Sequence, residues 1–393
     1  MTRAGGRMTG TAVSPAQELA PLLRADLRGR TAYGAPQLDV PVQLNTNENS
    51  YPVPRVVVDA MVEALAQAAP HLNRYPDREF VDLRTDLAAY LTAGSGVMLG
   101  VDQLWAGNGS NEVLQHLVQA FGGPERTALG FTPAYSMHPI IARTGGTRWI
   151  DGTRDERYDL SPESAAAQLR AHDPQLVFLC SPNNPTGTAL ALDVVQAALD
   201  AAPRAVVVVD EAYAEFARAG TRSALTLLAG RPRLVVTRTM SKAFALAGGR
   251  LGYLAADPAL IDLLRLVRLP YHLSTQTQIL ARAALAHADV LLGEVEAIKA
   301  QRDRIVAELT AMGLAPVASD ANFVLFGGLA DAPATWRALL DAGVLVRDVG
   351  LAGHLRVTAG TEAETTAFLQ ALGAVVPRRA AARAPVTPRP DGR

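Results

Sequence analysis

A lysine in an apolar stretch is the residue of this sequence with the most distinctive chemistry. Lys242 lies within a run of small and apolar residues between Ser241 and Arg250. Burial among such neighbours disfavours the charged ammonium and lowers the pKa of the amine, as a lysine that forms a Schiff base requires. Ser241 and Arg250 add a hydroxyl and a fixed cation, which suit a phosphate group. The stretch predicts a nucleophilic amine beside a phosphate-bearing ligand.

A carboxylate follows another apolar run. Asp210 comes directly after Val206–Val209, with Glu211 and Tyr213 close behind it. A run this apolar predicts a strand buried on both faces, so a carboxylate at its end needs a cationic partner. Capping of a following helix is the alternative role for Asp210, and the sequence alone leaves both open.

Two turns predict further polar groups beside these residues. Gly109, Ser110 and Asn111 open a helical pattern, and a helix N-terminus favours an anion such as phosphate. The pattern lacks the third glycine of a dinucleotide-binding turn and the lysine of a P-loop, so by itself it also fits an ordinary capped helix. Ser181–Gly187 contains two prolines, which fix a turn that presents polar amides.

These residues follow strands of one predicted sheet. Between residues 100 and 256, short β-rich runs alternate with helical patterns, which predicts an α/β fold with a largely parallel seven-stranded sheet. Ligands bind such sheets at the carboxyl ends of the strands, where the residues above would meet. The predicted strands are Gln103–Ala106, Arg126–Gly130, Thr147–Asp151, Leu176–Cys180, Ala205–Val209, Leu234–Thr237 and Leu251–Ala255.

The pattern changes after this sheet. A long helical stretch, 275–312, precedes short strands near 321–326, 344–347 and 355–358, which predicts a smaller α+β domain. The predicted organisation is a disordered extension (1–13), an N-terminal arm (14–45), a large domain (46–274), a small C-terminal domain (275–376) and a disordered tail (377–393).

Composition excludes several classes of protein. The 37 Lys and Arg residues nearly cancel the 38 Asp and Glu residues, so we expect small-molecule partners and neither nucleic acid nor a membrane surface. No stretch approaches the about 18 apolar residues of a membrane span, and the N-terminus lacks the apolar core of a secretory signal. The single cysteine, Cys180, should be a buried, inert strand residue, and no Cys or His spacing indicates a metal site. We therefore expect a cytoplasmic protein.

Three motifs together resemble the fold-type-I pyridoxal-phosphate aminotransferases in order and spacing. They are Ser181–Gly187, Asp210–Tyr213 and Ser241–Phe244. Finer motifs look like the histidinol-phosphate aminotransferase family, and the resemblance runs from about residue 24 to 372. These motifs are Asn45–Asn49, Asn73–Pro76, Pro133–Met137, Pro270–Ser274 and Leu355–Thr358.

The resemblance implies a role for each catalytic residue. Lys242 would carry pyridoxal 5′-phosphate as a Schiff base and then move a proton between the substrate and the cofactor. Asp210 would pair with the pyridine nitrogen, so that the ring acts as an electron sink. Asn184 and Tyr213 would hydrogen-bond the phenolate oxygen of the ring, and the bond before Pro185 would be cis.

The resemblance also implies binding residues. Tyr135 would stack on the cofactor ring, and Tyr75 would reach the cofactor phosphate of a neighbouring subunit, which makes the protein a homodimer. Arg356, assisted by Arg347, Tyr33 and Asn49, would bind the substrate, although Arg347 could instead form a surface ion pair with Asp348. The cofactor phosphate would lie against Gly109, Ser110, Asn111, Ser241 and Arg250.

The implied reaction is ping-pong transamination between L-histidinol phosphate and 2-oxoglutarate, a step of histidine biosynthesis that gives imidazole-acetol phosphate and glutamate. Guanidinium groups suit both the phosphate of one substrate and the carboxylates of the other. The alternatives are an aromatic amino-acid aminotransferase, a threonine-phosphate decarboxylase and a cofactor-binding regulator without turnover. The combination of Lys242, Asp210 and Arg356 disfavours the regulator.

Overall fold

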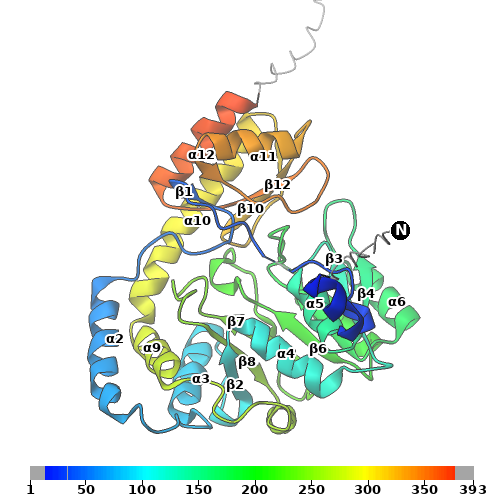
Figure 1. Cartoon of the computed structure of the whole chain (residues 1–393), viewed down its shortest axis with the longest axis vertical. Helices are drawn as coiled ribbons and strands as arrows, with labels where there is room; N and C mark the ends of the chain where they lie inside the picture. The colour runs from blue at the N-terminus through cyan, green and yellow to red at the C-terminus, as the bar shows by residue number, and fades with distance from the viewer. Residues whose placement is uncertain (1–13, 33, 377–393) are drawn as a thin grey trace, which may run out of the picture. The chain divides into compact units, whose positions relative to one another are not determined.

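The computed structural model describes residues 14–32 and 34–376, which form parts of two compact units (Figure 1). The first unit extends to Pro36, and its described residues contain the short helix α1 (Pro15–Leu19) and two 3₁₀ turns. The second unit begins at Gln37 and contains every other element. The predicted extension (1–13), the predicted tail (377–393) and Tyr33 lie outside the described residues.

A seven-stranded, mostly parallel sheet forms the centre of the second unit, as the sequence predicts. The strand order is β2-β8-β7-β6-β5-β3-β4, and only β8 runs antiparallel to its neighbours. The strand ends differ from the prediction by a few residues at most, because pairing with neighbours sets where a ladder stops. The strands are β2 (Leu104–Asn108), β3 (Thr127–Thr132), β4 (Arg148–Thr153), β5 (Leu176–Cys180), β6 (Val206–Asp210), β7 (Leu234–Thr239) and β8 (Leu251–Ala256).

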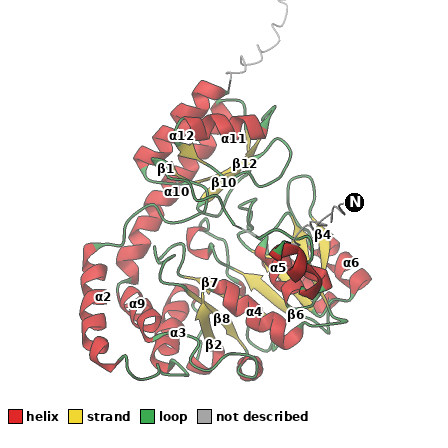
Figure 2. Ribbon diagram, in the orientation of Figure 1, coloured by secondary structure: helices red, strands yellow, loops and turns green. Residues whose placement is uncertain are grey.

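Helices cover this sheet on both faces. Every residue of β5, β6 and β8 is buried, which requires cover above and below the sheet and explains why these strands are apolar throughout. Figure 2 shows the helices around the strands. They are α2 (Arg55–Ala68), α3 (Val81–Ser95), α4 (Ser110–Phe121), α5 (Met137–Thr144), α6 (Pro162–His172), α7 (Leu192–Ala201) and α8 (Pro258–Leu264).

The C-terminal elements form a second, smaller sheet with its own helices. Strand β10 (Phe323–Gly327) pairs antiparallel with β12 (Leu355–Thr358) and with β9 (Ala315–Pro316). The end of the predicted arm joins this region, because β1 (Val42–Gln43) pairs in parallel with β11 (Val344–Leu345). Helices α11 (Ala332–Asp341) and α12 (Glu362–Val375) complete it. The boundary between two domains at residues 274 and 275 stays a prediction.

The prediction of one helical stretch over residues 275–312 is wrong in one respect. The structure has two helices, α9 (Thr275–Ala286) and α10 (Ala288–Ala311), separated at His287. The backbone of His287 has φ −122° and ψ 30°, outside the helical region. No proline or glycine marks this break, so the sequence has no local signal for it.

Two glycines allow a close approach at the end of β2. Gly109 has φ +81°, and the guanidinium of Arg250 occupies the place where its Cβ would lie. In β8, a Cβ on Gly252 would overlap the backbone nitrogen of Ser110. Both positions therefore need glycine, and the approach brings Arg250 beside the N-terminus of α4.

Candidate active site

A cavity of about 360 Å³ lies at the carboxyl ends of the parallel strands. Lys242 and Asp210 both line it, so the structure brings together the amine and the carboxylate that the sequence singles out. Its size falls in the range of small-molecule sites. The remaining lining residues are Thr46, Glu48, Ser110, Asn111, Tyr135, Cys180, Ala212, Tyr213, Thr239, Ser241, Ala247 and Arg250.

The amine of Lys242 is held in a desolvated position. Its Nζ donates a hydrogen bond to the carbonyl oxygen of Thr46 at 3.0 Å. Burial lowers the pKa of Lys242 to about 8, the Arg356 charge acts in the same direction, and Glu48 opposes both. At neutral pH about a tenth of the amine is therefore uncharged and nucleophilic.

Both carboxylate oxygens of Asp210 have hydrogen-bond donors. His138 Nε2 lies 2.9 Å from Oδ2, and the Thr237 hydroxyl donates to Oδ1 at 3.2 Å. Asp210 and His138 are buried, and the His138 ring stacks on Phe178. These contacts fix the direction of the carboxylate. His138 cannot be singled out from the sequence, because a single histidine next to a turn has no diagnostic spacing.

Tyr213 and Asn184 meet beside the cavity. The Tyr213 hydroxyl accepts hydrogen bonds from the amides of Asn184 (3.3 Å) and Asn47 (3.1 Å). Burial raises the pKa of Tyr213 to about 12, although Arg356 and the Asn47 bond oppose the shift, so the phenol is protonated at neutral pH. The peptide bond between Asn184 and Pro185 is cis, as predicted. Asn47 belongs to a motif noted in the sequence, but this contact was not foreseen.

Arg356 is buried next to the same group. Its Nη1 donates to Asn184 Oδ1 and its Nη2 to the carbonyl oxygen of Asn45, each at 2.7 Å. Its guanidinium also lies over the ring of Phe323, 5.1 Å from the centroid. These contacts hold a fixed cation close to Lys242, whose pKa it lowers.

The opposite end of the cavity can bind a phosphate group. Ser110 and Asn111 begin helix α4, whose free N–H groups favour an anion. Arg250 donates to the Ser241 hydroxyl at 3.4 Å, and the Tyr135 hydroxyl donates to Asn111 at 3.3 Å. The structure therefore assembles the predicted phosphate-binding residues at one place.

Three predicted site residues, Asn49, Arg347 and Tyr75, do not line the cavity. The Asn49 amide donates to the Ala243 carbonyl at 3.5 Å, and its oxygen accepts from the backbone of Tyr51. Arg347 is half-buried and pairs through its backbone with Arg356. Tyr75 is 80% exposed and stacks on Tyr271. Cys180 is buried as predicted and also borders the cavity, and burial raises the pKa of its thiol well above the usual range.

Comparison with known families decides the kind of protein. The family model described as aminotransferase class I and II matches residues 40–372. This chain belongs to the class I and II aminotransferases. The assignment agrees with the fold and with the lysine and aspartate in one cavity.

Relatives of this aminotransferase carry a more specific name. The histidinol-phosphate aminotransferase of Paenarthrobacter aurescens is 61% identical over 364 residues, covering 92% of this chain and 97% of the relative. That of Frankia casuarinae is 64% identical over 354 residues, covering 89% of each chain. Among solved structures, the histidinol-phosphate aminotransferase of Sinorhizobium meliloti in complex with pyridoxal-5′-phosphate aligns with a TM-score of 0.77 at 26% identity, covering 86% of this chain and 91% of that one.

Within residues 14–32 and 34–376, no three or more His, Cys, Asp or Glu side chains are grouped as a metal site would need. In the same residues, no helix combines the length and apolar character needed to cross a bilayer.

The low pKa of Lys242 can be measured directly, because the chain contains only two lysines, Lys242 and Lys299. In cofactor-free protein, trace labelling with an amine-reactive reagent should give Lys242 a midpoint near pH 8, since burial disfavours its charged form. Peptide mass spectrometry at each pH gives the labelling of both lysines, and Lys299 reports the pH dependence of the reagent itself. A Lys242 midpoint near 10.4, the value of a free lysine, would contradict the desolvated position.

Proposed function

We propose that this aminotransferase uses pyridoxal 5′-phosphate to transfer the amino group of L-histidinol phosphate to 2-oxoglutarate, in histidine biosynthesis. The observation that carries the proposal is that Lys242 and Asp210 line one cavity. Ser110, Ser241 and Arg250, which could hold a phosphate, line the same cavity, and Arg356 is hydrogen-bonded to Asn184. The name of the relatives at 61% and 64% identity supports the substrate. Imidazole-acetol phosphate and glutamate would be the products, and we place the reaction in the cytoplasm.

The donor set of the cavity fits pyridoxal 5′-phosphate. When bound, this cofactor supplies an electron sink for the carbanion formed at the substrate carbon. Asp210, held by His138 and Thr237, would keep a proton on the pyridine nitrogen. Asn184 and the protonated Tyr213 would hydrogen-bond the phenolate oxygen, and the Tyr135 ring would lie against the pyridine ring.

The phosphate of the cofactor would be held at the N-terminus of α4. Gly109, Ser110 and Asn111 supply the backbone turn and the first turn of the helix, while Ser241 and Arg250 supply a hydroxyl and a cation. The two close approaches at Gly109 and Gly252 explain why Arg250 can lie next to this turn. Charge and geometry both favour an anion there.

Lys242 would act as base and acid in turn. An amine with a pKa of about 8 can take a proton from the substrate carbon at neutral pH and return it to the C4′ carbon of the cofactor. Its hydrogen bond to the Thr46 carbonyl defines where the free amine rests.

The anionic end of each substrate would bind at Arg356, assisted by Arg347 and Asn49. Asn184 and the Asn45 carbonyl hold the Arg356 guanidinium in one orientation. A fixed guanidinium binds phosphate and carboxylate groups alike. One residue can therefore serve both half-reactions of a ping-pong enzyme.

The reaction can be followed in the visible absorption of the bound cofactor. Adding L-histidinol phosphate to the holoenzyme should convert the cofactor to its amine form, and 2-oxoglutarate should reverse this conversion. Lys242→Ala should abolish turnover while the protein stays folded, because no other amine lies in the cavity. Lys299→Ala, at a half-buried lysine of α10, is the matched control. Conversion by phenylalanine in preference to histidinol phosphate, or release of carbon dioxide from threonine phosphate, would favour the two alternative activities.

Replacing Arg356 should weaken the binding of both substrates. Loss of charge-assisted hydrogen bonds costs about 1.5–3 kcal/mol, so Arg356→Ala should raise KM about 10-fold or more for histidinol phosphate and for 2-oxoglutarate. Steady-state kinetics with each substrate varied in turn measures this. Arg55→Ala, at an exposed arginine of α2, should leave both values unchanged. Unchanged KM values in Arg356→Ala would remove this arginine from the substrate site.

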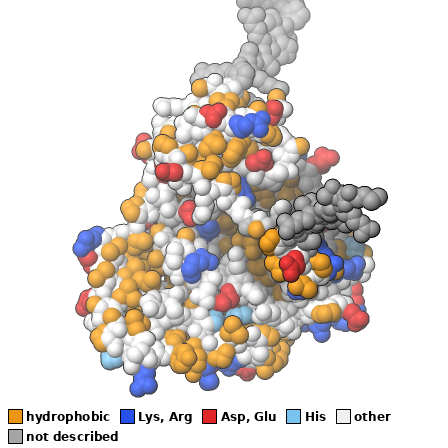
Figure 3. Space-filling model, in the orientation of Figure 1, with side chains coloured by type: hydrophobic (Ala, Val, Ile, Leu, Met, Phe, Trp, Pro, Cys, Tyr) orange, Lys and Arg blue, Asp and Glu red, His pale blue; other side chains and the backbone are white. Residues whose placement is uncertain are grey.

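A homodimer forms part of the proposed function, and an exposed apolar patch supports it. Tyr75 stacks on Tyr271 with ring centroids 4.5 Å apart, and Leu266 and Leu269 are 78% and 75% exposed on the same connection after α8. Arg268 ties this connection to the Tyr75 loop through the carbonyl of Arg78. Figure 3 shows hydrophobic side chains gathered along the lower edge of the face in view. A patch of this kind is typical of a protein interface.

Mixing two variants tests whether Tyr75 acts across this interface. Tyr75→Ala and Lys242→Ala should each have little or no activity alone. A mixed dimer has one site with an intact Lys242 that receives an intact Tyr75 from the other subunit, so unfolding and refolding the two variants together should restore activity. Activity assays of the mixture, with each variant refolded alone as the control, measure the recovery. A mixture no more active than its parts would place Tyr75 outside the neighbouring site.

A further inference from the structure

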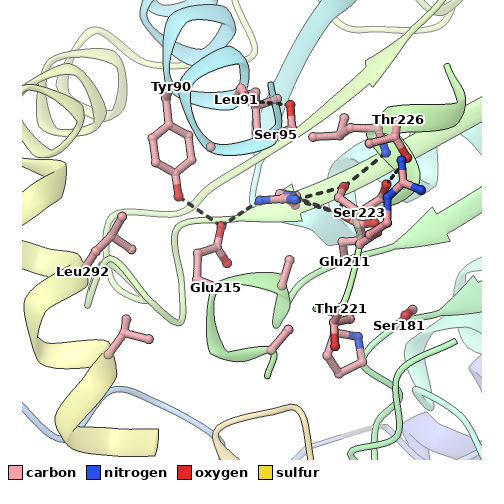
Figure 4. A pocket seen from close by; sticks show the side chains of 18 of the residues that line it. Tyr90, Leu91, Ser95, Ser181, Glu211, Glu215, Thr221, Ser223, Thr226 and Leu292 are labelled. Atoms are coloured by element: carbon pink, nitrogen blue, oxygen red, sulfur yellow. Dashed lines mark hydrogen bonds and ion pairs between the residues drawn. The ribbon is translucent and has the colours of Figure 1, made fainter. Parts of the chain in front are cut away.

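A second cavity, of about 540 Å³, has Tyr90, Glu211 and Glu215 among its lining residues (Figure 4). Arg238 of β7 and residues of α3 and α10 also line it, and Glu211 directly follows β6. Neither the proposed cofactor site nor the proposed substrate site uses these charges.

The two cavities lie against opposite faces of the same strand ends. Asp210, the last residue of β6, is paired in register with Thr237 of β7, and the two side chains are hydrogen-bonded. Side chains alternate between the faces of a sheet, so the residue after each of these two, Glu211 just past β6 and Arg238 within β7, points to the other face. Glu211 and Arg238 both line the second cavity, and Asp210 lines the first.

Arg238 makes a closed set of hydrogen bonds there. Its Nε and Nη2 donate to Glu211 Oε2 at 3.2 and 2.8 Å, and its Nη1 donates to Glu215 Oε1 at 3.2 Å. Ser223 donates to Glu211 at 2.7 Å, and Tyr90 donates to Glu215 at 3.3 Å, as the dashed lines of Figure 4 show. The Arg238, Glu211 and Glu215 side chains are only 12%, 4% and 6% exposed.

Stability alone is a poor explanation for these buried charges. The cost of removing an ion pair from water often equals or exceeds the attraction gained, so apolar side chains of similar volume would serve stability as well. A planar guanidinium that bonds two carboxylates does fix relative positions closely. Here those positions are the ends of β6 and β7, because Glu211 follows Asp210 and Arg238 precedes the turn to Lys242.

We propose that Arg238 and Glu211 are positioning residues that set the placement of Lys242 relative to Asp210. The ion pair holds the ends of β6 and β7 together on the face of the sheet opposite the cavity that Lys242 and Asp210 line. The turn after β7, in which the backbone of Ser241 donates to the Thr239 hydroxyl, carries this placement to Lys242. The inference rests on the proposed joint action of Lys242 and Asp210, and it adds two residues that touch neither substrate nor cofactor.

The first test keeps the positive charge at position 238 and removes the planar guanidinium group. Arg238→Lys retains a cation but cannot bond Glu211 and Glu215 with a planar group. The turn should loosen and admit water to Lys242, so labelling of this lysine in cofactor-free protein should slow about tenfold at pH 7.5, which corresponds to a midpoint about one pH unit higher. An unchanged midpoint in the folded variant would overturn the proposal.

The second variant distinguishes two causes of a shift in the Lys242 midpoint: a change in the position of this lysine and a change in the charge near it. Glu211→Gln keeps a carbonyl acceptor for the Ala224 backbone, which donates to Glu211 at 2.7 Å, and removes one negative charge. Loss of a negative charge alone would favour the neutral amine and move the Lys242 midpoint down, whereas loosening would move it up. We expect an upward shift. A downward shift would show that the pair acts through its charge, and the positioning role would be overturned.

Two further variants keep the result interpretable. Arg233→Lys, at the residue before β7, removes bonds to the carbonyls of Leu199, Ala202 and Ala205 near the end of the strand far from Lys242. It should lower the melting temperature without moving the Lys242 midpoint. Ser223→Ala removes one bond from the network and keeps both charges, so it provides a smaller upward shift if the charged variants do not fold. Because labelling needs neither cofactor nor substrate, its outcome is independent of whether histidinol phosphate is turned over.

Discussion

The site depends on one constraint: the amine of Lys242 must be kept largely out of water, in the same cavity as the carboxylate of Asp210. Lys242 has a pKa of about 8 because it is buried, and the Thr46 carbonyl is its hydrogen-bond acceptor. Asp210 tolerates burial because His138 and Thr237 occupy both of its oxygens. A hydrated amine would be almost entirely charged at neutral pH, and a hydrated carboxylate would lose its fixed direction. The cavity between them is therefore as much a requirement as the residues.

The fold meets this requirement through strand direction. Parallel strands β5, β6 and β7 end at one edge, so Asp210 at the end of β6 meets the loops that carry Asn184 and Lys242 there. The antiparallel β8 starts at the same edge and brings Arg250 back to the turn at Gly109. A lone antiparallel strand in a parallel sheet thus completes the phosphate-binding end.

Much of this arrangement can be predicted from the sequence, for physical reasons. Strands buried on both faces read as continuous apolar runs, which is why β5 matches its prediction and the others differ only at their ends. Lys242 and Asp210, at or after the strand ends, can be recognised from their residue types and their apolar neighbours in the sequence. The two-residue strands β1 and β9 leave too short a pattern to detect. The partners of buried charges, such as His138 for Asp210, lie far away in sequence and follow from no local rule.

The short segment from Val42 to Asn47 has a mechanical consequence. It begins as a strand paired with β11, its Asn45 carbonyl accepts from Arg356, the next carbonyl accepts from Lys242, and Asn47 bonds Tyr213. Consecutive carbonyl oxygens of one short segment thus accept from the guanidinium and from the amine. A displacement of this stretch of main chain would therefore move the acceptor of the substrate-binding arginine and the acceptor of the base together.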